Sequence, residues 1–177
     1  MGAAGVPIGV SQAMPVAVNI RQAGAADWPQ IWLVLEPVIR AGETYALPQT
    51  WREDEVRTYW FQTGNEVFVA EAAGNVVGTY FLRANALGSG SNVANCGYAT
   101  AAEARGQGVA RAMCLHSQAH ARARGFHAMQ FNFVVASNTV AIKLWRQLGF
   151  AEVGRVPTAF RHPQLGLVDA LIMHKLL

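Results

Sequence analysis

The chain has 177 residues, of which 52% are apolar and 14% are charged. This length and composition predict a single domain that buries a full hydrophobic core. The formal net charge is only +3 and Lys and Arg form no run, which argues against nucleic-acid binding and favours an enzyme with an anionic ligand. The two cysteines, Cys96 and Cys114, form no C-x-x-C pair and indicate a reduced, cytoplasmic setting.

Residues 1–14 are mostly small and lack both a basic region and a long apolar core. We therefore expect neither a signal peptide nor a membrane span there, but a flexible extension that precedes one domain at residues 15–177. The first strand is expected at 16–21. Asp27 and the proline two residues later then mark a helix start, and Pro37 inside that helix predicts a kink or a break.

The rest of the chain alternates between strand-like runs and amphipathic segments. The predicted elements, in chain order, are a helix at 52–61, strands at 66–71 and 76–83 joined by a turn at 73–75, a strand at 93–100, a helix from 109 that ends at Gly125, a strand at 128–135, a helix at 139–148, and strands at 150–156 and 168–175. This order predicts an α/β (α+β) fold, in which a mixed sheet of about seven strands has four helices on its two faces.

The turn between the strand at 93–100 and the next helix has the features of an anion site. Gly106 and Gly108 let the backbone approach a ligand closely, and the free N–H groups of a helix start attract phosphate. Arg105 and Arg111 add positive charge, so a diphosphate is the expected ligand. The segment contains neither Gly-Lys-Ser/Thr nor G-x-G-x-x-G, which excludes the two best-known nucleotide loops.

Two motifs carry a family resemblance. The loop has the pattern R-x-x-G-x-A over Arg105–Ala110, and N-x-x-A-x-x-L-[aromatic]-x-x-x-G-F is matched over Asn138–Phe150 with Trp145 as the aromatic residue. In this order they resemble the motifs of the GCN5-related N-acetyltransferase (GNAT) superfamily, and the resemblance covers residues 16–177. It implies a GNAT fold and an enzyme that uses acetyl-coenzyme A (acetyl-CoA) as co-substrate.

The resemblance also implies where acetyl-CoA binds. Two central strands are expected to splay apart after Tyr98 and after Gln130, with the pantetheine arm between them and the pyrophosphate on the glycine loop. The Asn138 amide offers a donor and an acceptor to that arm. The implied cofactor-binding residues are Ala99, Thr100, Ala101, Arg105, Gly106, Gln107, Gly108, Val109, Ala110, Arg111, Asn138 and Trp145.

Where Trp145 stands, the superfamily often has a tyrosine that protonates the departing thiolate. An indole N–H does not release its proton near neutral pH, so water or another group must act, and Tyr98 is the candidate. Cys96 could carry the acyl group, but nothing in the sequence would activate its thiol, and a buried inert thiol is the alternative. Glu71 and Glu103 could be bases acting through a water or simply solvated carboxylates.

Within the superfamily, the sequence resembles the L-azetidine-2-carboxylate N-acetyltransferases, through the Gly-x-Thr-Tyr loop at Gly42–Tyr45 and the segments Asn95–Tyr98 and Phe131–Phe133. Asn132 is a lone polar residue in an apolar strand, which favours a role in the site. The resemblance implies an acceptor site with Asn95 and Asn132 around the reacting amine and with Glu43, Thr44 and Tyr45 as substrate-binding residues. Tyr98 is the candidate acid, with a role in the core or in packing against the cofactor as the alternative.

The expected acceptor is a small amine or amino acid, in particular a cyclic secondary amino acid, and the expected role is detoxification of an amino-acid analogue. A phosphinothricin-type enzyme, a protein N-acetyltransferase and a non-catalytic coenzyme A sensor are the alternatives. We expect a homodimer that binds neither nucleic acid nor membranes. The histidines have no ligand spacing, which predicts no metal site. Asp169 fits either a dimer contact or a salt bridge.

Overall fold

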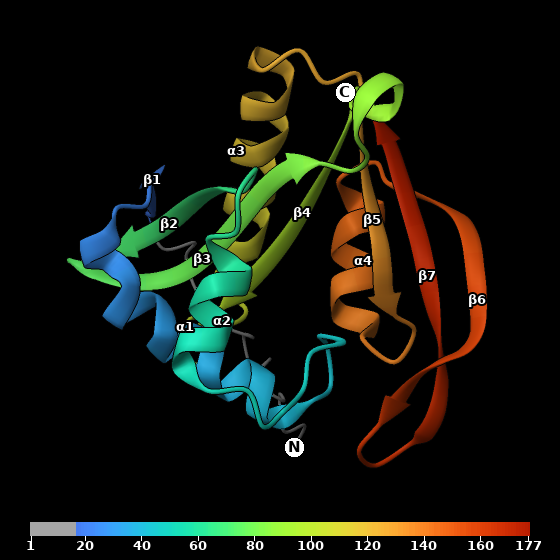
Figure 1. The fold of residues 1–177 in the computed structure, drawn as a ribbon, viewed down its shortest axis with the longest axis horizontal. Coiled ribbons are helices and arrows are strands. Elements are labelled where there is room, and N and C mark those ends of the chain that lie inside the picture. Colours follow the sequence, from blue (N-terminus) through green and yellow to red (C-terminus); the bar gives the residue numbers. More distant parts are fainter. Residues whose placement is uncertain (1–16) are drawn as a thin grey trace, which may run out of the picture.

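The computed structural model describes residues 17–177, and its central feature is a mixed seven-stranded sheet with the order β1-β2-β3-β4-β5-β7-β6 (Figure 1). The predicted extension at 1–14 lies outside the described residues. The strands are β1 (Asn19–Gln22), β2 (Glu66–Ala72), β3 (Asn75–Ala84), β4 (Val93–Thr100), β5 (Ala128–Val135), β6 (Ala151–His162) and β7 (Gly166–Leu176). The helices are α1 (Trp28–Ala41), α2 (Glu53–Trp60), α3 (Val109–Ala123) and α4 (Thr139–Gln147), with short 3-10 turns at Ala25–Asp27, Gly88–Gly90 and Ala102–Ala104.

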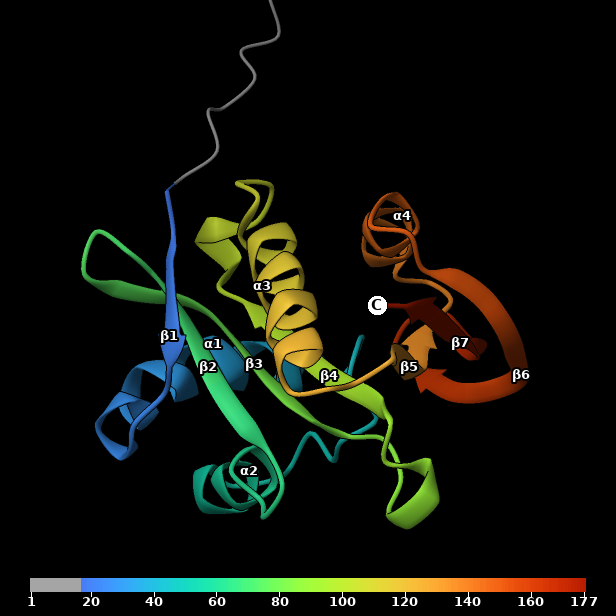
Figure 2. The same ribbon diagram turned by 90° about the horizontal axis from the view of Figure 1, so that it is seen from above.

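The four helices cover both faces of the sheet, as the sequence predicted. Figures 1 and 2 show α1 and α2 on one face and α3 and α4 on the other. We call these the α1–α2 face and the α3–α4 face. Only β4 and β5 pair in parallel, and the connection between them contains α3. A parallel pair needs such a crossover, whereas the antiparallel pairs β2–β3, β3–β4 and β6–β7 are joined by shorter connections.

The parallel pairing of β4 with β5 is very short. It consists of Val93 opposite Ala128 and Ala94 opposite Met129, after which the two strands diverge (Figure 1). We expected the strands to separate after Tyr98 and after Gln130, so the separation begins earlier on both strands, and by four residues on β4. The reason is local, because the side-chain amide of Asn95 takes the Gln130 carbonyl as its acceptor at 2.8 Å.

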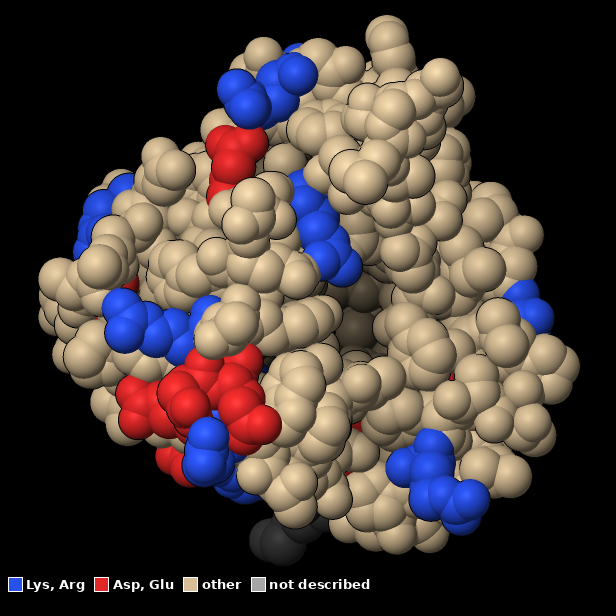
Figure 3. Space-filling model, in the orientation of Figure 1, with Lys and Arg blue, Asp and Glu red and all other residues tan. Residues whose placement is uncertain are grey.

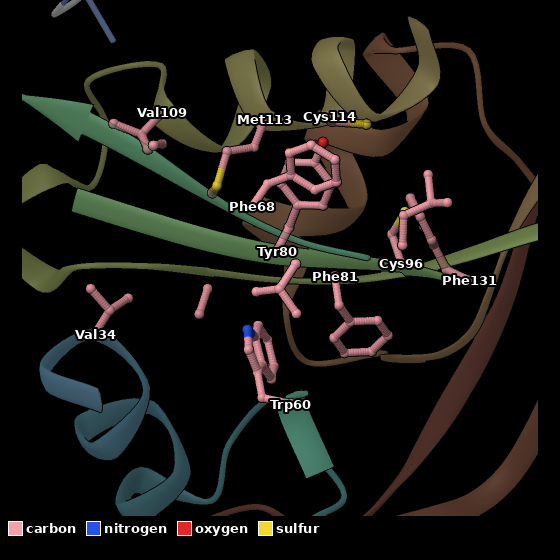
Figure 4. Packing of buried hydrophobic residues seen from close by; sticks show 14 of the residues in the cluster. Val34, Trp60, Phe68, Tyr80, Phe81, Cys96, Val109, Met113, Cys114 and Phe131 are labelled. Atoms are coloured by element: carbon pink, nitrogen blue, oxygen red, sulfur yellow. The ribbon is translucent and has the colours of Figure 1, made fainter. Parts of the chain in front are cut away.

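The hydrophobic core fills both sides of the sheet. Phe68 stacks on Tyr80 with ring centroids 4.8 Å apart, and the ring of Trp60 meets Phe81 edge to face at 5.0 Å. Figure 4 shows Met113 of α3 reaching the sheet from one side and Trp60, at the end of α2, reaching it from the other. Both residues are fully buried. The sheet is therefore anchored to helices on both faces on the β1–β4 side of the gap.

Helix α1 continues through Pro37 to Ala41, so of the kink or break predicted there, the break does not occur. Proline removes one hydrogen bond, to the carbonyl four residues earlier. That carbonyl belongs to Leu33, a residue that is 70% exposed, so water can satisfy it. The helix at 109 ends slightly earlier than predicted, at Ala123, and Gly125 follows it with a positive φ of 85°.

The closing hairpin is longer than the sequence indicated, because β6 and β7 extend well into the segment between the two predicted strands. A register shift in β6 accommodates Pro157, and Thr158 adopts a positive φ of 52° there. The Thr158 N–H donates to Asp169 Oδ1 at 3.0 Å, and Arg155 donates to Asp169 Oδ2 at 3.1 Å. Asp169 thus forms the salt bridge that was one of its two expected roles. The Thr158 N–H and Arg155 lower the pKa of this carboxyl.

None of the helices in residues 17–177 is long and apolar enough to cross a bilayer.

A buried hydrogen-bond chain joins α2 to the sheet and allows a stability test. Trp60 Nε1 donates to Thr79 Oγ1 at 3.1 Å, and Thr79 Oγ1 donates to the Phe68 carbonyl at 2.9 Å. Thr79→Val keeps the shape but leaves the indole N–H without a partner, so unfolding in urea should show a loss of about 1–3 kcal/mol. Thr58→Val on the exposed side of α2 should change stability by less than about 0.5 kcal/mol. Equal stabilities for the two variants would contradict this account.

Candidate active site

The glycine loop leads directly into α3 and leaves its N-terminus open. Gly106 and Gly108 have positive φ angles of 75° and 84°, a conformation that favours glycine. No side chain caps the helix, so the N–H groups of its first turn remain available to an anion. A Cβ built on Gly106 would meet no atom within 4 Å, which means that a ligand can approach the loop from this side.

The charges around this loop are also free. Arg105 and Arg111 are exposed, and neither forms an ion pair with any residue of the described chain. Gln107 braces the loop by donating from Nε2 to the Glu103 carbonyl at 2.7 Å. Val109 is buried in the core, so it offers a ligand only its backbone. The loop can therefore hold a pyrophosphate through backbone N–H groups and two guanidinium groups.

Of the three β4 residues expected to pair with a pantetheine arm, one faces the gap. The Ala101 N–H donates to the Val77 carbonyl of β3 at 2.9 Å, so it is not available to a ligand. Backbone groups alternate in direction along a strand, and Ala99 therefore also faces β3. Thr100 lies between them and presents its N–H and C=O to the gap. The expectation for Ala99 and Ala101 is thus corrected.

Aromatic side chains fill the gap on the α3–α4 face. The Tyr98 ring lies 5.8 Å from that of Phe131 and 5.3 Å from that of Trp145, and the Trp145 and Phe131 rings are 5.1 Å apart. Trp145 is only 8% exposed. These three side chains come from β4, β5 and α4, so they hold the diverging strands at a fixed separation.

Neither Tyr98 nor Cys96 has the properties of a reactive group. The Tyr98 hydroxyl is hydrogen-bonded to Ser117 Oγ of α3 at 2.7 Å, and burial raises the pKa of Tyr98 well above its usual range. A raised pKa makes it a weaker acid toward a departing thiolate. Burial also raises the pKa of Cys96 to about 12, so its nucleophilic thiolate form is scarce near neutral pH.

A chain of amides crosses the gap on the α1–α2 face. Asn95 Nδ2 donates to the Gln130 carbonyl at 2.8 Å, Gln130 Nε2 donates to Asn132 Oδ1 at 2.9 Å, and Asn132 Nδ2 donates to Asn85 Oδ1 at 2.6 Å. We call Asn85, Asn95, Gln130 and Asn132 the amide chain. The structure therefore brings the two predicted asparagines together. Sequence reasoning missed Gln130 and Asn85, since nothing in a loop or in strand alternation marks them as partners.

Asn132 reaches the amide chain for a reason other than the one expected. It is exposed, not enclosed in an apolar strand, and it lies where the pairing of β5 with β7 shifts register, between Phe131 and Val134. Asn95 is only 7% exposed, and its Oδ1 accepts no hydrogen bond from the described residues. Asn95 thus offers a free acceptor beside the gap.

The loop after α1 covers the same face. Gly42 ends α1 with a positive φ of 63°, and the Tyr45 hydroxyl then donates to the Tyr98 carbonyl at 2.8 Å. Burial raises the pKa of Tyr45 well above its usual range, so this hydroxyl keeps its proton. Glu43 and Thr44 are partly exposed and make no side-chain hydrogen bond with the described chain. Of the predicted substrate-binding trio, Tyr45 is thus the residue with a hydrogen bond to a strand that borders the gap.

The remaining candidates have structural roles or lie elsewhere. Asn138 Oδ1 caps α4 by accepting from the Ala141 N–H at 3.2 Å, which leaves its amide donor for a ligand. Glu71 binds Arg21 between β1 and β2, at the far edge of the sheet, so it is wrong as a candidate base. Glu103 is exposed beside the glycine loop. Within residues 17–177, no group of three or more His, Cys, Asp or Glu residues could hold a metal ion.

A hollow marks this site on the molecular surface. Figure 3 shows it near the centre of the α1–α2 face, between the part that carries α1 and α2 and the part formed by β5, β7 and β6. Basic atoms lie at its rim. The candidate site thus has two chemically different regions, the anion site at the start of α3 and the amide chain on the α1–α2 face.

Comparison with known proteins agrees with this arrangement. The family model described as "Acetyltransferase (GNAT) family" matches residues 31–150. A solved GCN5-related N-acetyltransferase from Kribbella flavida is 42% identical, with a TM-score of 0.87 over 91% of this chain and 98% of that chain. The fold is also shared with a Salmonella typhimurium acetyltransferase solved with its cofactor acetyl-CoA, at 22% identity and a TM-score of 0.79 over 91% of this chain and 94% of that one.

A curated relative, N-acetyltransferase aca1 of Schizosaccharomyces pombe, is 30% identical over 99 residues, which are 55% of this chain and 47% of that protein. The chain spans about half the length of the curated relatives it matches. The family match begins within α1 and ends at Phe150, just after α4, and therefore includes the glycine loop, both diverging strands and the aromatic contacts between them. The chain belongs to the acetyltransferase (GNAT) family of N-acetyltransferases, whose acetyl donor is acetyl-CoA.

Proposed function

We propose that this chain transfers the acetyl group of acetyl-CoA to the nitrogen of a small amine or amino acid by direct attack of the neutral amine. The observation that carries the proposal is the separation of β4 from β5 after two residue pairs. The separation leaves backbone groups of both strands without a ladder partner. It lies between an uncapped helix start and the amide chain.

The residues present fit acetyl-CoA. Its pyrophosphate would lie on the N–H groups at the start of α3, with Arg105 and Arg111 beside it, and its pantetheine arm would pair with Thr100 and the Asn138 amide. When bound, acetyl-CoA supplies an acetyl thioester, and transfer forms one N–C bond while the C–S bond breaks and the thiol sulfur gains a proton.

The amide chain is suited to orienting an amine. Because Asn95 Nδ2 is committed to the Gln130 carbonyl, its Oδ1 is left to accept a hydrogen bond from an ammonium or a neutral amine. Asparagine does not remove a proton, so water carries the proton away from the amine. Trp145 cannot donate a proton and Tyr98 is held by Ser117, so we assign protonation of the thiolate to water as well. A free thiol has a pKa of about 8.5, which makes its thiolate a tolerable leaving group.

For the acceptor itself, we propose a cyclic secondary amino acid of the azetidine-2-carboxylate or proline-analogue type. The proposal rests on the sequence resemblance around Gly42–Tyr45 and on the proximity of the two asparagines that it named. Asn95 and Asn132 both contact Gln130, and Tyr45 lies on the same side of β4. Acetylation of such an analogue would serve its detoxification.

The cofactor site is tested by changing one glycine at each end of α3. Gly108→Val should abolish the increase in melting temperature that acetyl-CoA gives, because a side chain would block the approach of the pyrophosphate. Gly125→Val is a matched control, since Gly125 has nearly the same φ, 85° against 84°, but lies at the other end of the helix. It should lose comparable stability and keep the thermal shift. A normal shift with Gly108→Val would refute the assignment.

Direct transfer is tested at the two buried thiols. With its pKa at about 12, Cys96 should not carry an acetyl group. Cys96→Ala should therefore retain kcat within about threefold, as should Cys114→Ala, which removes the other buried thiol. Intact-protein mass spectrometry after mixing with acetyl-CoA alone should show no acetyl-enzyme. An acetyl adduct that is lost in Cys96→Ala would establish a covalent route instead.

The acceptor site is tested with the amide chain. Asn95→Ala and Asn132→Ala should each lower kcat/KM for the amine by at least about tenfold, the equivalent of about 1.4 kcal/mol of transition-state stabilisation, while acetyl-CoA affinity is retained. Asn92→Ala, an exposed asparagine just before β4, is the control and should change neither quantity. The finer proposal fails if azetidine-2-carboxylate and proline analogues are inert while phosphinothricin or a peptide is acetylated well.

A further inference from the structure

One arginine lies on the acceptor side of the sheet without a described partner. Arg83 of β3 is directly opposite Asn95 of β4 in the antiparallel register. Side chains of directly opposite residues point to the same face, and their Cβ atoms lie about 4.5–5.5 Å apart. Arg83 and Asn95 therefore emerge side by side on the α1–α2 face.

The position of the Arg83 guanidinium is set by its neighbours. Its central carbon lies 5.3 Å from the ring centroid of Phe81, two residues earlier on the same face of β3. Phe81 is buried and lies opposite Gly97, where an added Cβ would come within 2.6 Å of its ring and 3.1 Å of the Tyr45 hydroxyl. The glycine thus lets the Phe81 ring lie against β4, and the ring in turn supports the guanidinium.

The charge of Arg83 is not neutralised by the described chain. Arg83 is half-buried, yet it forms neither an ion pair nor a side-chain hydrogen bond with any residue in 17–177. Arg155 of β6, by contrast, contacts both Glu152 and Asp169. A partly buried guanidinium with five donors and no partner favours an anion, and its planar fork matches a carboxylate.

We infer that Arg83 binds the carboxylate of the acceptor, so that the acceptor is an α-amino acid and not a simple amine. In an α-amino acid, one carbon separates the nitrogen from the carboxylate. An acceptor nitrogen at Asn95 Oδ1 therefore places its carboxylate within reach of the adjacent Arg83, whose side chain extends further from the sheet. The inference rests on the proposed function and makes Arg83 the residue that selects the substrate class.

The test compares matched acceptors with and without the carboxylate. The pairs are azetidine-2-carboxylate with azetidine, proline with pyrrolidine, and a primary α-amino acid with its decarboxylated amine, each measured as kcat/KM with saturating acetyl-CoA. Wild-type protein should prefer the carboxylate-bearing member by about 10- to 100-fold, the range expected for hydrogen bonds to a charged group.

Variants then test whether Arg83 causes the preference for acceptors that carry a carboxylate. Arg83→Gln should raise KM for the carboxylate-bearing acceptor by about 10- to 100-fold with little change in kcat, and should leave the decarboxylated amine unaffected. Arg83→Lys keeps the positive charge but lacks the planar guanidinium, so its KM should lie between those of the wild-type protein and Arg83→Gln. Arg57→Gln is the control, because that guanidinium also lies over a ring, 5.9 Å from the centroid of Trp28, but it belongs to α2. Melting temperatures and acetyl-CoA affinity are measured for each variant.

The outcomes separate this inference from the proposed function. If decarboxylated amines are acetylated as efficiently as their amino acids, or if Arg83→Gln lowers both equally, the role of Arg83 is overturned while N-acetyl transfer stands. If no α-amino acid is acetylated and none gives a thermal shift with the wild-type protein, the inference is overturned irrespective of what other amines do. If no amine of any kind is acetylated, the proposed function itself is overturned.

Discussion

Backbone groups that leave a β-ladder need other partners, and the separation of β4 from β5 after Ala94 and Met129 frees such groups in the middle of the sheet. The chain satisfies some of them itself. The Asn95 side-chain amide donates a hydrogen bond to the Gln130 carbonyl, and the Tyr45 hydroxyl donates one to the Tyr98 carbonyl. What remains unpaired on the two strands is the surface along which an extended ligand can bind. The other parts of the candidate site are arranged around this one interruption.

The two faces of the gap are chemically different because side chains alternate along β4. Tyr98 points to the α3–α4 face, where it meets Phe131 and Trp145 in a dry aromatic cluster. Asn95 and Gly97 point to the other face, where amides, Arg83 and Tyr45 gather. One strand thus separates a rigid apolar support from a polar site. This explains why the aromatic residue of α4 can be a tryptophan here, since its contacts are those of packing.

Much of the fold follows from local sequence. The element order, the strand at 93–100 and the helix after the glycine loop were predicted within a few residues, because alternation and glycine placement are local signals. Pro37 does not break α1, since whether a proline breaks a helix depends on where the freed carbonyl lies. The length of the closing hairpin depends on Asp169 accepting from Thr158, a contact between distant parts of the chain that no local pattern contains.

The sequence pointed to some residues of the candidate site but not to their geometry. The resemblance named Asn95, Asn132 and Tyr45, and the structure places all three beside the gap. It did not give their partners Gln130 and Asn85, nor Arg83, whose position depends on the register between β3 and β4. Register and the point of strand separation are set by tertiary packing. The same limit explains why we expected the backbone groups of Ala99 and Ala101 to face the gap, although they face β3.

The amide chain has a direction, because Asn95 donates to the backbone carbonyl of Gln130, and the side-chain amides of Gln130 and Asn132 donate to Oδ1 of Asn132 and Asn85 in turn. None of these groups gains or loses a proton in water. The nearest hydroxyl and thiol groups, Tyr45, Tyr98 and Cys96, have pKa values raised by burial far from neutrality. These side chains therefore keep the same charge between about pH 6 and pH 9. The pH dependence of acetylation would then report the titration of the amine itself, and a given amine would be acetylated faster as the pH rises toward its own pKa.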